Sequence, residues 1–247
     1  MRIIVSIIFC VFVSAMSHAQ LRLSIESGLV TTQYNDVQAP NGDQNAGTLF
    51  SFNDNFEEDD PKGYLRAEVT YTINNRHSIE VTAAPLTVAY QNATLPKISF
   101  QGVSFEGSGI DGRYKFNTYR GSYRYRLLRK SNFTFELGAS ILVRDARIAL
   151  TQDDITVDNT DLGFVPLVSF ELAYQPFQSI GFQLKGDALV GPVGRAEDIF
   201  AGVTVDLFSD IISVKAGYRL IEGGADVDQV YNFAYFHFAS IGIVYTL

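Results

Sequence analysis

The chain has 247 residues, of which 19% are charged and 13% aromatic, and its formal net charge is −8. A net acidic chain without basic runs is a poor candidate for nucleic-acid binding. Tyr and Phe are abundant, at 13 and 19 residues, and Trp is absent. This composition favours a strand-rich protein, because aromatic residues are enriched in strands.

The N-terminus has the pattern of a secretory signal peptide. Arg2 supplies a positive charge, residues 3–16 form an apolar stretch, and Ser17-His18-Ala19 is a small-x-small cleavage site. The apolar stretch is shorter than the roughly 20 residues that a membrane-spanning helix needs. We therefore predict export and cleavage after Ala19.

This cleavage divides the chain into a signal peptide, 1–19, and a single mature domain, 20–247. The only cysteine, Cys10, lies in the signal peptide. The mature domain is therefore expected to contain no disulfide and no thiolate metal site.

The mature domain repeats one pattern, in which uncharged and charged residues alternate. Ile212, Val214 and Ala216 alternate with Ser213 and Lys215, for example. Side chains on a strand point to opposite faces in turn, so each such segment has one apolar and one polar face. In a closed sheet with lipid outside and water inside, this is typical of a transmembrane β-barrel.

The pattern predicts an all-β fold, an antiparallel up-and-down transmembrane barrel with ten strands, over 21–34, 63–73, 78–91, 113–128, 133–149, 163–175, 180–190, 197–208, 211–221 and 234–247. Short turns alternate with longer connections, over 35–62, 92–112, 150–162, 191–196 and 222–233. Short periplasmic turns and longer outer loops are typical of outer-membrane barrels, and an even strand number places both termini on the periplasmic side. Eight strands, with one hairpin outside the membrane, is the alternative topology.

One face of each strand is free of charge and is predicted to contact lipid, where an Arg or Lys at the bilayer midplane costs about 2–4 kcal/mol. The opposite faces collect the charges and are predicted to line the lumen: Glu26, Arg66, Glu68, Glu80, Arg120, Arg124, Arg126, Glu136, Arg144, Glu171, Lys185, Asp187, Asp206, Lys215 and Arg219. Buried charges must be paired or hydrated, so these near-balanced charges predict a salt-bridged, largely filled interior. A wide diffusion pore would need about 16 strands. The alternative interpretation is a soluble β-protein with these charges in water.

The mature domain resembles the bacterial outer-membrane β-barrel superfamily, in particular its small barrels of eight to ten strands. The terminal strand, Ser240 to Leu247, is similar to the C-terminal signal that the barrel-assembly machinery reads, although the family usually ends in Phe. The segment 216–226 is similar to the penultimate strand and loop of uncharacterised members. The resemblance implies a Gram-negative outer-membrane location, with outer-membrane lipids and lipopolysaccharide as neighbours, and no known activity.

The sequence offers no recognisable catalytic constellation, and no cofactor is expected. His77 is predicted in a periplasmic turn and His237 on the lipid-facing side of the last strand, near Tyr235. Lipid A deacylases pair a His with a Ser two residues on, but here that position is Ala239, and Ser240 points to the other face. The ten-stranded outer-membrane proteases use a His-Asp dyad, and no adjacent His-Asp occurs in this sequence.

The first outer loop is acidic and contains Asp54, Glu57, Glu58, Asp59 and Asp60. Carboxylates are ligands that Ca²⁺ prefers. The spacing does not match an EF-hand loop, so a solvated acidic loop is the simpler interpretation.

Three functions remain open from the sequence. The leading hypothesis is a barrel with a narrow, charge-paired lumen and a structural or surface-binding role. The second is a small solute channel or carrier, in which Arg120, Arg124 and Arg126 form a basic ladder that attracts anions. The third, a lipid A-modifying or proteolytic barrel enzyme, is disfavoured because its constellation is missing.

Overall fold

The computed structural model describes residues 19–42, 45–58, 62–192, 194–208 and 211–247. The predicted signal peptide, apart from Ala19, lies outside this part of the chain. The described residues form thirteen strands and one short helix, α2: β1 (Ala19–Gln38), β2 (Phe50–Ser51), α2 (Phe52–Asn55), β3 (Glu57–Glu58), β4 (Lys62–Ile73), β5 (His77–Ala84), β6 (Thr87–Phe100), β7 (Val103–Arg129), β8 (Phe133–Gln152), β9 (Ile155–Phe177), β10 (Ile180–Gly191), β11 (Gly194–Phe208), β12 (Ile212–Val227) and β13 (Val230–Thr246).

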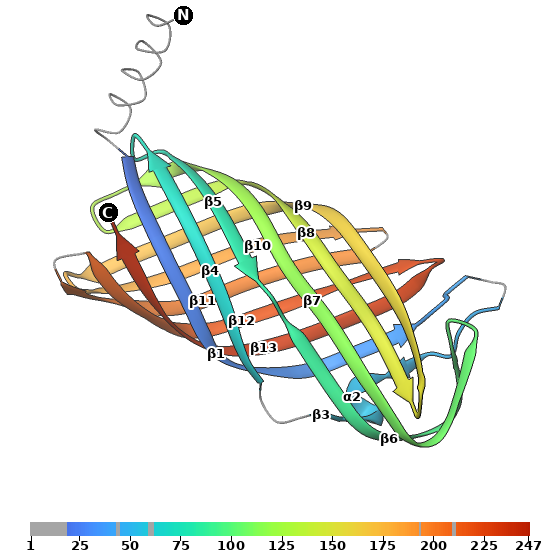
Figure 1. Ribbon diagram of the computed structural model, residues 1–247. Coiled ribbons are helices and arrows are strands. Elements are labelled where there is room, and N and C mark those ends of the chain that lie inside the picture. Colours follow the sequence, from blue (N-terminus) through green and yellow to red (C-terminus); the bar gives the residue numbers. More distant parts are fainter. Residues whose placement is uncertain (1–18, 43–44, 59–61, 193, 209–210) are drawn as a thin grey trace, which may run out of the picture.

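The strands close into an antiparallel barrel, which confirms the predicted fold class (Figure 1). Long strands pair with their neighbours in the sequence, except that β5 and β6 both pair with β7, and β1 closes the ring by pairing with β13 from Arg22↔Thr246 to Gln38↔Tyr231. The chain end lies beside the start of β1, where the N–H of Leu21 donates to the Leu247 carbonyl at 3.1 Å. In this part of the chain no helix is long and apolar enough to cross a membrane.

The structure has thirteen strands where the sequence predicts ten, for two reasons. The predicted strand over 78–91 is broken at Pro85 and Leu86, and its two parts, β5 and β6, pair with successive stretches of β7. Proline interrupts a strand because it has no N–H for the ladder. In addition, the two-residue strands β2 and β3 lie inside the segment predicted as the first outer loop.

The predicted outer loops are also shorter than expected, because the strands continue past the predicted ends. β6 and β7 form a hairpin that closes at Phe100↔Val103. The two residues between them, Gln101 and Gly102, adopt φ of 50° and 78°. Two positive φ values suit a tight hairpin turn. The prediction of a loop over 92–112 is therefore wrong.

The polarity of the outer and inner faces of the barrel changes along its length. In the membrane part of β7, the outward positions carry Tyr119, Tyr123 and Leu127, which are exposed, while Arg120 and Arg124 are buried inside. Towards the end that carries α2 the polarity of the two faces reverses. Arg113 and Lys115 face out, and Tyr114 and Phe116 are buried. The uncharged outward belt and the polar interior are those of a transmembrane barrel, whereas the reversed part has the polarity of a protein in water.

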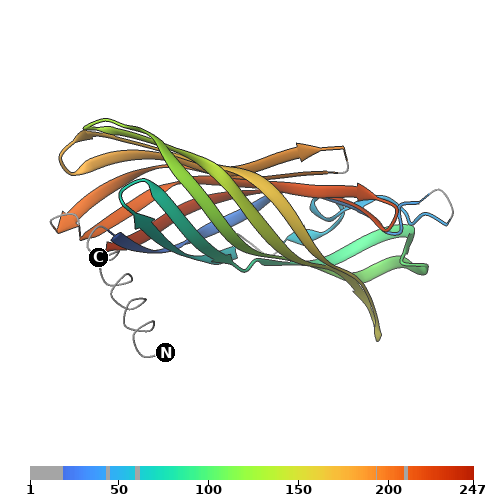
Figure 2. The same ribbon diagram turned by 90° about the horizontal axis from the view of Figure 1, so that it is seen from above.

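Figures 1 and 2 show this second part as an extension at the end of the barrel opposite the chain terminus. Its core is aromatic: Phe50, Phe52, Phe56, Phe100 and Tyr90 are all buried. Phe52, on α2, stacks on Tyr90 of β6 with ring centroids 4.6 Å apart. The extension therefore closes the outer end of the lumen with a hydrophobic core.

Candidate functional site

The interior of the membrane part is filled by one continuous network of ion pairs. Seven carboxylates and eight basic side chains take part: Glu26, Glu68, Glu80, Glu136, Glu171, Asp187 and Asp198 with Arg22, Arg66, Arg120, Arg124, Arg126, Lys185, Lys215 and Arg219. They come from every long strand except β6 and β13. Alternation makes this possible, because each strand contributes only its inward residues.

Asp198 of β11 is the centre of one half of this network. Its Oδ2 accepts from Arg66 at 2.9 Å and from Arg120 at 2.8 Å, and its Oδ1 accepts from Arg219 at 2.6 Å. Its side chain is 4% exposed. Arg219 continues the network by a bidentate contact with Glu26, at 2.9 Å for each bond. Such paired contacts are the strongest that an arginine makes with a carboxylate.

The other half follows Lys185 and Arg124. The Lys185 ammonium lies 2.6 Å from Glu80 and 3.0 Å from Glu68. Arg124, which is fully buried, lies 2.9 Å from Glu80 and 3.0 Å from Glu171. Every arginine of the predicted basic ladder is thus held by carboxylates, so the ladder is neutralised in this structure.

The structure buries twelve of the fifteen predicted lumen residues together, and the other three lie at the ends of the lumen. Arg126 pairs with Glu136 at 2.7 Å beside a periplasmic turn, and Asp206 lines a vestibule at the periplasmic end. Arg144 lies at the outer end and contacts Asp161.

The sequence interpretation missed two members of the network, Asp198 and Arg22. Each lies an even number of residues from a predicted lumen residue on the same strand, and so on the same face: Asp198 from Asp206 on β11, and Arg22 from Glu26 on β1. The alternation alone contained this signal.

The periplasmic vestibule is a cavity of about 320 Å³ lined by Arg22, Glu68, Glu171 and Lys215 among others. These four residues belong to the ion-pair network, so the vestibule ends where the network begins. Water can enter from this end of the barrel, but the paired side chains occupy the lumen beyond this point.

A larger cavity of about 630 Å³ lies at the outer end, between β9 and β10. The two strands pair from Ile180↔Phe177 to Ala188↔Val168 and no further. Beyond this point β9 pairs only with β8 and β10 only with β11. Both views show the outer halves of β9 and β10 diverging (Figures 1 and 2). The cavity therefore lies behind a gap in the barrel wall.

Local sequence explains why the wall opens here. Pro166 lies on β9 two residues beyond the last pair with β10, and a proline has no N–H to donate to a further pair. The cavity is also lined by four glycines, Gly191, Gly194, Gly223 and Gly224. At Gly223 an added Cβ would lie 3.6 Å from Phe116 Cζ, across the space that the missing side chain leaves empty.

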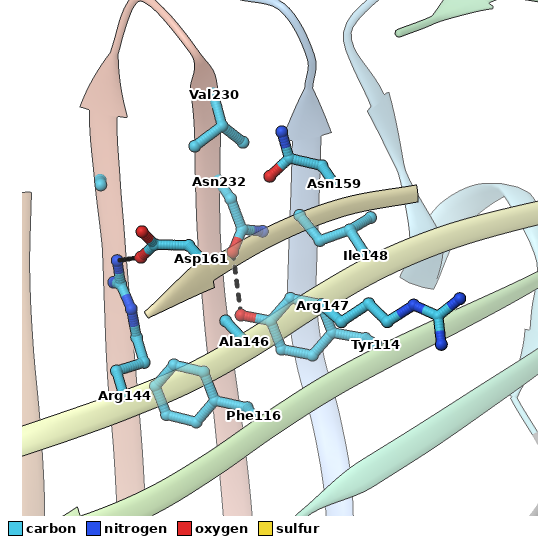
Figure 3. Close-up of a pocket in the computed structure, with 11 residues that line it drawn as sticks. Tyr114, Phe116, Arg144, Ala146, Arg147, Ile148, Asn159, Asp161, Val230 and Asn232 are labelled. Carbon is cyan, nitrogen blue, oxygen red and sulfur yellow. Dashed lines mark hydrogen bonds and ion pairs between the residues drawn. The ribbon is translucent and has the colours of Figure 1, made fainter. Parts of the chain in front are cut away.

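The outer end of this cavity is polar. Figure 3 shows the adjoining wall, where the Arg144 guanidinium contacts Asp161 at 2.5 Å and the Tyr114 hydroxyl donates to Asn232 at 2.9 Å. Burial raises the pKa of Tyr114. The Nε of Arg144 is buried, and no hydrogen-bond partner for it is found among the residues that the structure describes.

A second polar cluster lies outside the barrel, just beyond the apolar belt. Tyr34 donates to Glu222, and Arg195 donates to both of them while its guanidinium lies 4.8 Å from the Phe233 ring centre. Burial and the hydrogen bond to Glu222 raise the pKa of Tyr34 to about 12. The hydrogen bond to Tyr34 raises the pKa of Arg195.

The two histidines that the structure describes lie on the lipid-facing side, at opposite ends. His77 contacts the Tyr123 hydroxyl at 2.9 Å. His237 contacts the Tyr218 hydroxyl through Nδ1 and Gln33 through Nε2, and its ring lies 4.6 Å from that of Tyr235. Ser240 is buried on the other face. The expected contact of His237 with Tyr235 and the separation from Ser240 are both present.

The acidic first loop is only partly described, since Asp59 and Asp60 lie outside the described residues. Glu57 accepts from Asn92 at 3.1 Å, and Glu58 accepts from Thr32 at 2.9 Å. Among the described residues no group of three or more acidic, His or Cys side chains could hold a metal ion.

No protein-family model matches the sequence, and no curated protein matches it. Solved structures are similar. The attachment invasion locus protein Ail of Yersinia pestis, in complex with the heparin analogue sucrose octasulfate, is 12% identical with a TM-score of 0.35, over 92% of this chain and 99% of that one. The Neisserial surface protein A is 13% identical, with a TM-score of 0.32 over 92% and 96% of the two chains. The translocator domain of the autotransporter NalP from Neisseria meningitidis is 12% identical, with a TM-score of 0.36 over 91% and 88%.

This chain is a closed antiparallel β-barrel with the polarity of a membrane-spanning protein. Its closed ring of strands has an uncharged, exposed belt and a charged, buried interior. At these identities and TM-scores, no ligand and no functional residue is transferred from the similar structures.

Proposed function

We propose that this protein is a closed, non-conducting barrel that anchors a folded outer extension, and that the extension has a surface-binding role. The ion-pair network across the lumen is the observation that carries this proposal. Breaking a buried pair by removing one partner costs about 3–5 kcal/mol, so the layer is not expected to open by thermal fluctuation. The aromatic core above it is a second barrier.

The extension supports a role at the surface. It has a core of its own, built around Phe52 and Tyr90, and its outward face is charged. Lys115 pairs with Asp145 at 2.8 Å and Arg147 with Asp158 at 2.7 Å, all on β7, β8 or β9 just beyond the apolar belt. We propose that Lys115 and Arg147 also contact lipopolysaccharide phosphates, because they lie at the height of the headgroups.

Planar-bilayer recording tests the closed lumen. The wild-type protein is expected to insert and show no unitary conductance. The matched variant is Arg124→Ala, which removes the fully buried side chain between Glu80 and Glu171 and is expected to give small, flickering openings, provided that it folds. A variant at an outward position, Tyr123→Ala, is the control for insertion. Stable, regular openings of the wild-type protein would overturn the proposal.

A further inference from the structure

The gap between β9 and β10 leads from the lipid-facing surface into the outer cavity. Uncharged outward residues continue to its edges: Phe164 on β9 is 69% exposed and Val190 on β10 is 70% exposed. Directly behind them the cavity is lined by Val165, Pro166 and Leu189. The surface that contacts acyl chains and the wall of the cavity are therefore continuous.

The cavity has the size and chemistry of a ligand site. Its volume of about 630 Å³ lies within the roughly 300–1,000 Å³ that is usual for small-molecule pockets. Phe116 and Leu142 form its inner wall, and Gly223 faces Phe116 across it. Polar groups converge at the outer end only, where Arg144 and Asp161 lie. An apolar body with one polar end fits this arrangement.

We propose that this cavity holds an acyl chain of an outer-leaflet lipid, which enters sideways between β9 and β10. The chain lies against Phe116, Val165 and Leu189. The polar head stays at the outer edge, beside the side chains of Arg144 and Asp161. The occupant is an amphiphile of the membrane rather than a solute from the medium, because the gap opens onto the apolar belt.

The absence of Trp from the chain allows a direct test with three conservative variants in the otherwise unchanged protein. Phe116→Trp reports from the inner wall of the cavity. Phe164→Trp reports from the lipid-facing edge of the gap. Phe200→Trp reports from inside the sealed lumen, where Phe200 is buried beside Lys215 and Arg219. Each variant is folded into vesicles of phospholipid with brominated acyl chains, because bromine quenches indole fluorescence on contact.

We expect strong loss of emission for Phe164→Trp, nearly as strong loss for Phe116→Trp, and little loss for Phe200→Trp. Gly223→Leu is the blocking variant, because a Cβ at Gly223 would meet only ordinary contacts, including Phe116 Cζ at 3.6 Å. Added to Phe116→Trp, it is expected to restore emission, whereas added to Phe164→Trp it is expected to change nothing. Gly121→Leu, on the lipid face with open space around it, is the matched control and should leave both readings unchanged.

Three outcomes would overturn the proposal. One is quenching of Phe116→Trp no stronger than that of Phe200→Trp. Another is quenching of Phe116→Trp by iodide in water instead of by brominated lipid, which would indicate a solvent-filled cavity. The last is quenching only when a brominated free fatty acid is added to unbrominated vesicles, which would exclude the bilayer chain as the source. None of these readings depends on conductance, so this inference and the closed lumen can fail separately.

Discussion

Removing the charge of Asp198 should destabilise the barrel more than any change at the rim of the lumen. Asn at this position keeps the shape and one acceptor oxygen, but three buried guanidinium groups, of Arg66, Arg120 and Arg219, lose their shared counter-charge. Each of these arginines keeps one other carboxylate, so the network is weakened rather than abolished. We therefore expect Asp198→Asn to lower the free energy of unfolding by about 3–5 kcal/mol, the usual cost of leaving a buried charge without its partner.

The measurement is urea unfolding of the protein in lipid vesicles, followed by circular dichroism and extrapolated to water. Asp206→Asn is the matched control, because among the described residues the Asp206 carboxylate accepts from Ser213 and Gln175 only, at the rim of the vestibule, and its loss should cost at most about 1 kcal/mol.

A double variant, Asp198→Asn with Arg120→Met, tests the coupling. It should be less destabilised than the sum of the two single variants, because the second change removes a charge that the first left uncompensated. A loss for Asp198→Asn as small as that of the control would refute the reasoning that the interior is a mutually dependent ion-pair layer.

Three further predictions concern other parts of the molecule. Phe52→Ala should lower the stability of the outer extension by about 3–5 kcal/mol, the usual loss for a buried Phe. Limited proteolysis of the variant should then cut the extension while the membrane strands stay protected. Equal protection of the extension in the variant and the wild type would contradict a separate core. Gly138→Val should abolish the folded, heat-resistant form on gels, because a Cβ there would lie 1.9 Å from the Tyr123 carbonyl oxygen, whereas Gly121→Val, in open space, should fold normally. The pKa of Tyr34 should be about 12 and not the ordinary 10. Its contribution to stability is therefore complete below pH 10 and is lost as the pH rises towards 12. An ultraviolet difference titration of the wild type against Tyr34→Phe that shows a phenol ionising near pH 10 would contradict this.

The alternation of side chains determined most of the fold. A period of two places Arg120 and Arg124 on one face and Tyr119 and Tyr123 on the other wherever the strand is, so the lipid-facing belt and the charged lumen follow from local geometry. The same rule covers Asp198 and Arg22, although neither was recognised. The alternation did not predict the break at Pro85. Whether a proline interrupts a strand depends on which neighbouring strand would have accepted the missing N–H, and the sequence does not give that pairing.

Tertiary structure alone decided the partners and the spaces. No sequence pattern states that Asp198 meets three arginines from three other strands, because the pairing depends on how the strands stagger around the ring. On the N-terminal side of Asn117 in β7 the outer face becomes charged and the inner face apolar, and the position of this change depends on where the membrane ends. The outer cavity depends on the early end of the β9–β10 ladder, at Val168 and Ala188. These features arise from contacts between residues far apart in the chain, and local propensity carries no information about them.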